Sequence, residues 1–269
     1  MEILLPLFIL TPLSAFVISL VLPSRAEGAL SKTAFIAAGV QVLFTACFTL
    51  AWLIQGQVDL NVKEVVVYRS PGYEFFIDLY FDRVSAHFLL VGALLTFMIT
   101  IYSRYYLHRE TGFKRFFNTV LFFFTGYSIT VLSGNFETLF LGWEVLGISS
   151  FLLIAYYRDR YLPVKNALKV FSIYRVADVG LILAMWLSHH LWHENITFQK
   201  LHDSVLVHEH LASHSAVGII ISLMILLSAA AKSAQLPFSS WLPRAMEGPT
   251  PSSAIFYGSL SVHIGVFLL

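Results

Sequence analysis

The sequence predicts an all-α integral membrane protein with about eight transmembrane helices. The first observation is composition: the 269 residues are 57% hydrophobic and only 12% charged, whereas soluble domains carry about 25% charged residues. The second is a series of apolar runs of about 20 residues, the length that spans a bilayer as a helix. The net charge of +1 offers no basic face for nucleic acid. We therefore expect membrane lipid, and no nucleic acid, around this chain.

Windows of about 19 residues place the spans along the chain. The expected spans are residues 3–22, 33–54, 84–103, 116–133, 136–157, 164–187, 215–236 and 250–269. The first run fits a retained helix better than a cleaved signal, because Met1, Glu2 and Ile3 supply no basic n-region.

Two connections are long. In residues 55–83, the run Val65-Val66-Val67-Tyr68 precedes the turn signal Ser70-Pro71-Gly72, which predicts a small β-hairpin on the membrane surface. The connection 188–214 holds seven of the ten histidines. Zinc binding there is conceivable, but no cysteine supports it and the spacing matches no known site, so a solvated polar loop is favoured and no metal is expected.

The seventh span ends in a helix breaker. Lys232 is followed within five residues by Pro237, then by a short segment, 238–247, and a Pro- and Gly-rich stretch. Proline removes a backbone donor and breaks a helix. Freed backbone groups at membrane depth are tolerated only inside protein or beside water. The sequence therefore predicts a discontinuous seventh helix with Lys232 near its break.

The domain organisation expected is a single membrane domain over 1–269. Residues 1–80 form N-terminal helices and the surface hairpin, and residues 81–269 form the main helical region. The chain stops at Leu269 inside an apolar run without an interfacial anchor, so we expect it to be the front part of a longer protein.

Basic residues in the loops predict the orientation. Loops 23–32, 104–115 and 158–165 together carry nine Lys and Arg residues, and the alternate connections carry four. The positive-inside rule places the richer loops in the cytoplasm and the N-terminus outside. We expect a multi-pass protein of the cell inner membrane.

Ionisable residues inside the spans are the main functional signal. Glu144, Lys169, Arg175, Asp178 and Lys232 all lie within apolar runs. A charge at the bilayer centre costs roughly 2.5–3.5 kcal/mol on insertion scales, so such residues usually mark an ion or proton route. Both signs occur on neighbouring spans, which allows pairing.

Each of these residues also has a structural interpretation. Glu144 is a switching carboxylate or one half of a structural ion pair. Lys232 follows three alanines, and its pairing with Glu144 could open and close as a proton moves, or be a static salt bridge. Arg175 and Asp178 are spaced i,i+3 and can neutralise one another locally. Lys169 projects about 120° away from Arg175 and could instead snorkel to the surface.

His263 lies in the last span. A lone intramembrane histidine can relay protons near neutral pH, or it can be a hydrogen-bonded packing residue. Haem ligation is not expected, since a bis-histidine site needs two histidines at membrane depth. The sequence contains no GxGxxG or Walker motif, and its single cysteine, Cys47, cannot hold an iron–sulfur cluster. No cofactor is therefore expected.

Four motifs in order resemble a known family, the antiporter-like proton-translocating membrane subunits. The resemblance covers about 81–269 and rests on Phe140-Leu141-Gly142-Trp143-Glu144, on Asn166-Ala167-Leu168-Lys169 with Arg175-Val176-Ala177-Asp178, on Lys232-Ser233-Ala234-Gln235-Leu236-Pro237, and on 245–254. Members include the subunit L type of respiratory complex I, the A-type subunit of the Mrp sodium/proton antiporter, and the DabB subunit of an inorganic-carbon transporter. Asp82-Arg83-Val84-Ser85 departs from a family pattern that usually has glycine second.

The resemblance implies a fold, a mechanism and partners. The family fold has two inverted repeats of five helices within about fourteen helices, of which this chain would hold the first repeat and the start of the second. Glu144 would pair with Lys232, with Lys169, Arg175 and Asp178 lining the same path. Tyr257 stands where complex I members carry histidine, and the segment ending in His263 looks more like the DabB branch.

Three functions follow as expectations. In the DabB-like case, proton flow drives inorganic-carbon uptake, and the partner is a large soluble zinc-containing DabA-like protein. The alternative is a proton-pumping subunit of NADH:quinone oxidoreductase (complex I), or a Mrp-type cation/proton antiporter, with the other membrane subunits as partners. The third possibility is a structural scaffold whose charges are locked pairs. In none of these is the chain expected to act as an enzyme by itself.

Overall fold

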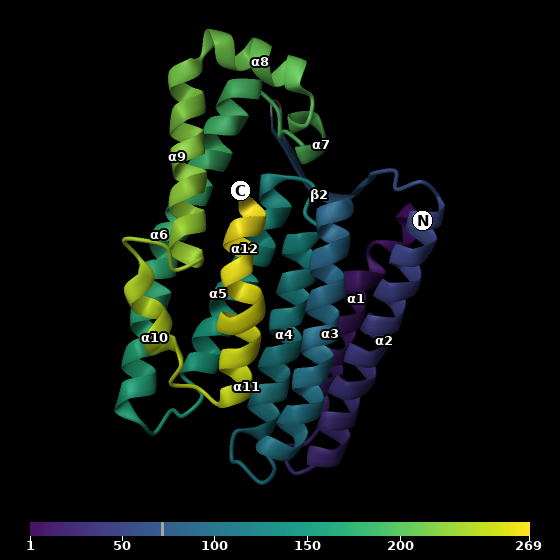
Figure 1. Cartoon of the computed structure of the whole chain (residues 1–269), viewed down its shortest axis with the longest axis vertical. Helices are drawn as coiled ribbons and strands as arrows, with labels where there is room; N and C mark the ends of the chain where they lie inside the picture. The colour runs from purple at the N-terminus through teal and green to yellow at the C-terminus, as the bar shows by residue number, and fades with distance from the viewer. Residues whose placement is uncertain (71–72) are drawn as a thin grey trace.

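A computed structural model of the chain shows a bundle of long helices with a small hairpin at one end (Figure 1). It describes residues 1–70 and 73–269, without the side chains of residues 64, 73, 206, 209, 211, 213 and 256–258. The long helices are α1 (Leu7–Val21, preceded by the short turn η1, Glu2–Leu4), α2 (Glu27–Ile54), α3 (Arg83–Tyr106), α4 (Phe113–Val131), α5 (Phe136–Ile154), α6 (Tyr161–Trp192) and α9 (Ser215–Lys232).

The expected spans correspond to helices along the whole chain. Six of the described helices are long and apolar enough to cross a membrane: α1, α2, α3, α5, α6 and α9. The first of these spans includes the short turn η1 together with α1. The expected fourth span is α4, a 19-residue helix. The expected eighth span is assembled from α11 (Thr250–Ser253), a π-helical segment η3 (Ala254–Leu260) and α12 (Ser261–Leu268). The chain is therefore a multi-pass membrane protein.

Neighbouring helices pack in pairs. The closest associations are α4 with α5, α6 with α9, α2 with α3, and α1 with α4. Gly142 makes the α4–α5 contact possible, since a Cβ placed there would lie 2.6 Å from the backbone nitrogen of Thr130. Small residues are the usual means by which helices approach closely in membranes. Helix α5 is thereby fixed between α4 on one side and α6 on the other.

The predicted break after the seventh span is present. Helix α9 ends at Lys232, and Ala234 adopts a left-handed conformation with φ 55°. The chain resumes as a 3₁₀ turn, η2 (Ser239–Trp241), and a four-residue helix, α10 (Leu242–Ala245). The Trp241 indole donates to the Ala231 carbonyl at 2.9 Å, and the Ser233 hydroxyl donates to the Val262 carbonyl at 2.7 Å. These bonds hold the break against the end of α9 and against α12.

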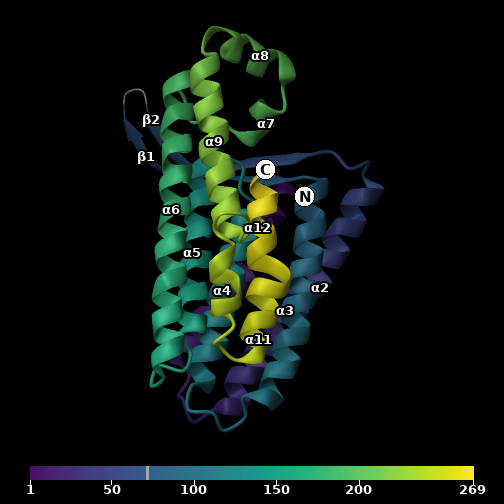
Figure 2. The same ribbon diagram turned by 60° about the vertical axis from the view of Figure 1, so that its left-hand side comes forward.

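The predicted hairpin is also present, as strands β1 (Leu60–Ser70) and β2 (Tyr73–Phe81), paired antiparallel. Figure 2 shows it extending across the end of the bundle that carries α7 (Phe198–Leu201) and α8 (Ser204–Ser213). The predicted turn at 71–72 lies outside the described residues. The hairpin docks through backbone bonds from Tyr80 to Leu132 and from Gly134 to Asp78, each 2.8 Å long.

The histidine-rich connection differs from the expected polar loop. Helix α6 continues to Trp192, five residues beyond the expected span, and α7 and α8 occupy much of the remainder. The hydropathy window ends early because His189 and His190 lower it, although both residues remain helical. Among the described residues, no group of three His, Cys, Asp or Glu side chains could hold a metal ion.

Candidate functional site: a charge cluster

Three neighbouring helices bring together four of the six predicted site residues. Helix α6 packs against α5 and α9, and it contributes Arg175 and Asp178, while α5 contributes Glu144 and α9 ends in Lys232. We call these four residues the charge cluster. Lys232 is the last residue of α9 and is buried between the helices. The chain leaves the helix directly after it, at the break.

Arg175 joins two carboxylates on different helices. Its Nη1 donates to Glu144 Oε2 at 2.9 Å, and its Nη2 lies 2.8 Å from Asp178 Oδ2. The second contact is close enough for an ion pair but lacks the angle of a hydrogen bond. The expected i,i+3 pair of Arg175 and Asp178 is thus confirmed, and the same guanidinium also reaches across to α5.

Lys232 is fully buried and has an aromatic surrounding. Its side chain is 0% exposed. The Nζ atom lies 4.5 Å from the ring centres of both Trp143 and Tyr174, and it donates to the Trp143 carbonyl at 3.3 Å. A desolvated cation between two ring faces is held by cation–π attraction. The ammonium therefore has one carbonyl acceptor and two aromatic faces in place of water.

The predicted Glu144–Lys232 pair is open in this structure. Among the described residues, Lys232 forms no ion pair, and Glu144 is held by Arg175. With all four groups ionised the cluster sums to zero, so one added or removed proton leaves one net charge in a low-dielectric site.

The remaining two predicted residues lie outside the cluster. Lys169 is half-buried on α6, and His263 is exposed on α12. In the part of the chain that the structure describes, neither side chain makes a hydrogen bond or ion pair with the four cluster residues. Their roles in proton movement remain predictions.

Three uncharged residues complete the site and were not predicted as members. The Trp143 indole donates to Asp178 Oδ1 at 2.8 Å, so this residue contacts both Asp178 and Lys232. Tyr174 supplies the second ring over the lysine. A Cβ at Gly147 would lie 3.4 Å from Arg175 Nη2 and 3.9 Å from Lys232 Nζ. The sequence offered one indication of the two aromatic residues: Trp143 and Tyr174 each directly precede a charged residue of the cluster.

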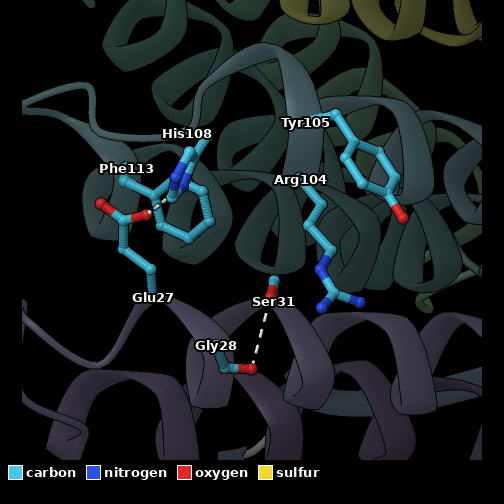
Figure 3. Close-up of a pocket in the computed structure, with 7 residues that line it drawn as sticks. All are labelled: Glu27, Gly28, Ser31, Arg104, Tyr105, His108 and Phe113. Carbon is cyan, nitrogen blue, oxygen red and sulfur yellow. Dashed lines mark hydrogen bonds and ion pairs between the residues drawn. The ribbon is translucent and has the colours of Figure 1, made fainter.

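The pocket shown in Figure 3 is separate from this site. It measures about 320 Å³ and lies between α2 and the end of α3, with Glu27, Arg104 and His108 in its lining. His108 Nδ1 lies 2.9 Å from Glu27 Oε2. No residue of the charge cluster lines this pocket.

The fold and the cluster define a class of protein, a multi-pass membrane subunit in which ionisable side chains from adjacent helices meet. Comparison with known proteins identifies the family. The sequence model of the family "NADH:quinone oxidoreductase/Mrp antiporter, TM" matches residues 133–269, just over half of the chain. A second model, "NADH-Ubiquinone oxidoreductase (complex I), chain 5 N-terminus", matches residues 69–117. The chain belongs to this antiporter-like family, as its motifs indicated.

Relatives and solved structures agree with this family. NADH-quinone oxidoreductase subunit L of Escherichia coli is 32% identical over 98% of this chain, which covers 43% of that protein. NADH-ubiquinone oxidoreductase chain 5 of Phoca vitulina is 37% identical over 70% of this chain and 29% of its own length. The chain therefore spans less than half of these relatives.

Two solved structures share the fold. The Mrp complex from Dietzia sp. superposes with a TM-score of 0.74 at 24% identity, covering 96% of this chain and 27% of that one. The archaeal membrane-bound sulfane sulfur reductase gives a TM-score of 0.75 at 17% identity, covering 99% of this chain and 51% of that one.

Proposed function

We propose that this chain is the proton-translocating part of an antiporter-like membrane subunit of the complex I or Mrp type. The observation that carries the proposal is the state of Lys232, which is fully buried and, among the residues that the structure describes, forms no ion pair, while Arg175 holds both nearby carboxylates. A buried group of this kind is costly in a purely structural role, and intramembrane ionisable residues are functional by default.

The geometry suggests how the cluster handles a proton. Desolvation disfavours the charged lysine, whereas a carboxylate moving closer favours it. While Arg175 engages Glu144, Lys232 is held by the Trp143 carbonyl and by the rings of Trp143 and Tyr174. If Arg175 released Glu144, that carboxylate could turn toward the lysine and stabilise its protonated form. Arg175 therefore acts as the switching element that decides whether Lys232 holds or releases its proton.

The complex I and Mrp alternatives have better support than inorganic-carbon uptake. The family descriptions and the E. coli and seal relatives carry complex I or Mrp names. None of the relatives described above is an inorganic-carbon transporter subunit, so a DabA-like zinc partner has no support from them. We propose other membrane subunits of such a complex as partners and the cell inner membrane as the location, with the N-terminus outside as the loop charges predict.

A substitution series at Lys232 tests the proposal. The full-length protein, in its native assembly, is measured for proton translocation in membrane vesicles with a pH-sensitive dye. Lys232→Arg keeps a positive charge that cannot be released near neutral pH, and Lys232→Met removes the charge in a side chain of similar length. Both changes should abolish translocation, because each removes a releasable proton.

A matched control separates this effect from assembly. Lys200→Met makes the same change at an exposed lysine on α7 that pairs with Glu194 at 2.5 Å, and it should translocate normally. Assembly is checked by the yield of the intact complex. Translocation at the normal rate in Lys232→Arg, with normal assembly, would contradict proton release by this lysine and leave the locked-pair scaffold as the better interpretation.

A further inference from the structure

A groove at the basic-loop end of the bundle combines cationic and apolar lining. It measures about 500 Å³ and lies between α1 and α4, beside the end of α5 and the α5–α6 connection. Three basic residues line it: Lys114, Arg115 and Arg158. The single acidic residue in its lining is Glu110. This end carries the loops richest in Lys and Arg, and Figure 1 places it opposite the hairpin.

The basic groups are fixed in place yet retain unused donors. Lys114 Nζ donates to the carbonyls of Leu20 and Leu22 at 2.9 and 2.6 Å, at the end of α1. An ammonium has three N–H donors, so one remains. Arg115 Nη2 donates to the Tyr156 carbonyl at 2.8 Å, while its buried Nε has no partner. The groove thus presents oriented cationic donors that are not neutralised by their own contacts.

Arg158 adds a second guanidinium close to the first. Both guanidiniums line the same groove, where their like charges repel each other. Arg158 is exposed, and none of the described ion pairs includes it. Two guanidiniums that repel each other in one groove are stabilised by an anion between them, and guanidiniums suit phosphate oxygens through paired N–H donors.

The rest of the groove is apolar and runs along the helices. Phe122 lies seven residues beyond Arg115 on α4, about 10 Å along the axis. Its ring stacks on Phe16 of α1, with ring centres 5.0 Å apart. Leu20 and Leu152 are exposed in the same lining. A charged end followed by an apolar length matches the shape of a phospholipid, a headgroup followed by an acyl chain.

We propose that this groove binds one anionic phospholipid, with its phosphate at Arg115 and Arg158 and an acyl chain along Phe122 and Leu152. Basic pockets between helices on the cytoplasmic side are suited to anionic headgroups. The neighbouring pocket of Figure 3 has one guanidinium in its lining, that of Arg104, where the groove has two, and its carboxylate, Glu27, lies against His108. The site is distinct from the charge cluster and does not depend on the proposed function.

Lipid titration tests the site directly. The full-length protein, purified with the subunits that accompany it, is titrated with phosphatidylglycerol or phosphatidylcholine and the bound lipid is counted by native mass spectrometry. Phosphatidylglycerol should bind more tightly, and Arg158→Gln should weaken it about fivefold while leaving phosphatidylcholine unchanged. Arg158 is exposed, so its substitution leaves the fold intact. Arg115→Gln should weaken phosphatidylglycerol at least as much.

Arg160→Gln is the matched control. Arg160 is two residues from Arg158 on the same connection, lies over the Tyr157 ring at 4.3 Å, and does not line the groove. Equal weakening by Arg158→Gln and Arg160→Gln, or equal affinity for the two lipids, overturns the proposal. Displacement of phosphatidylglycerol by inorganic phosphate at the same concentration would assign the groove to a free anion and also overturn it.

Discussion

Replacing Gly142 with alanine tests how the α4–α5 contact supports the site. The new Cβ would lie 2.6 Å from Thr130 nitrogen and 2.8 Å from Gly126 oxygen, whereas ordinary contact begins near 3.4 Å. The two backbones must therefore separate by 0.4 Å to reach the shortest contact that real Cβ atoms make, 3.0 Å, and by 0.8 Å to reach ordinary contact. Backbone cannot rotate aside as a flexible side chain can, so the helices themselves have to move.

The expected cost follows from packing. A gap of 0.5–1 Å forfeits about a quarter to a half of the attraction between facing atoms, and overpacking typically costs about 1–3 kcal/mol. That cost corresponds to a Tm lower by roughly 2–12 °C for a unit of this size. Proton translocation should fall as well, because Trp143 and Glu144 directly follow the displaced residue and α5 is held against α6 on its other side.

The assay is thermal unfolding in detergent, with Gly147→Ala as the matched control. At Gly147 the added Cβ meets Arg175 Nη2 at 3.4 Å and Lys232 Nζ at 3.9 Å, both at the ends of flexible side chains. Gly147→Ala should therefore leave Tm nearly unchanged while altering translocation. Equal Tm values for the two variants would refute the claim that backbone approach at Gly142 limits the packing of α5.

Two further predictions concern the hairpin and the guanidinium. Burial raises the pKa of Asp78 on β2 to about 6 from 3.8, against the opposing effects of Asn61 and Lys63. The folded protein thus holds a proton that the unfolded chain releases earlier, so Tm should decline as pH rises from about 4 to 6, and Asp78→Asn should remove this part of the decline. Arg175→Lys keeps the charge but loses the planar fork that spans two carboxylates; vesicle translocation should fall at least tenfold with normal assembly, and full activity would contradict a bridging role.

Hydropathy and breaker residues predicted much of the fold. The spans, the hairpin and the end of α9 at Lys232 follow from local patterns that depend on neighbours in sequence. The i,i+3 pairing of Arg175 and Asp178 is likewise local. The fourth span and the eighth were also located, although the eighth is divided into α11, η3 and α12.

Contacts between helices were less predictable. The rotation of α6 relative to α5 decides whether Glu144 meets Arg175 or Lys232, and no periodicity in a single sequence specifies that rotation. The aromatic neighbours of Lys232 depend on the same rotation. Asp82 caps α3, because its side chain accepts from the Ser85 nitrogen at 2.7 Å; the departure from the family pattern is at the next residue, Arg83.

The bond between Trp241 and Ala231 links the two sides of the helix break. Ala231 immediately precedes Lys232, and the indole of Trp241 also packs edge-on against Tyr174 at 5.2 Å between ring centres. One tryptophan therefore contacts both the backbone that carries the lysine and a ring that covers it. A shift of the short helices after the break would move Trp241. Both the backbone next to Lys232 and the Tyr174 ring over its ammonium would then be displaced together.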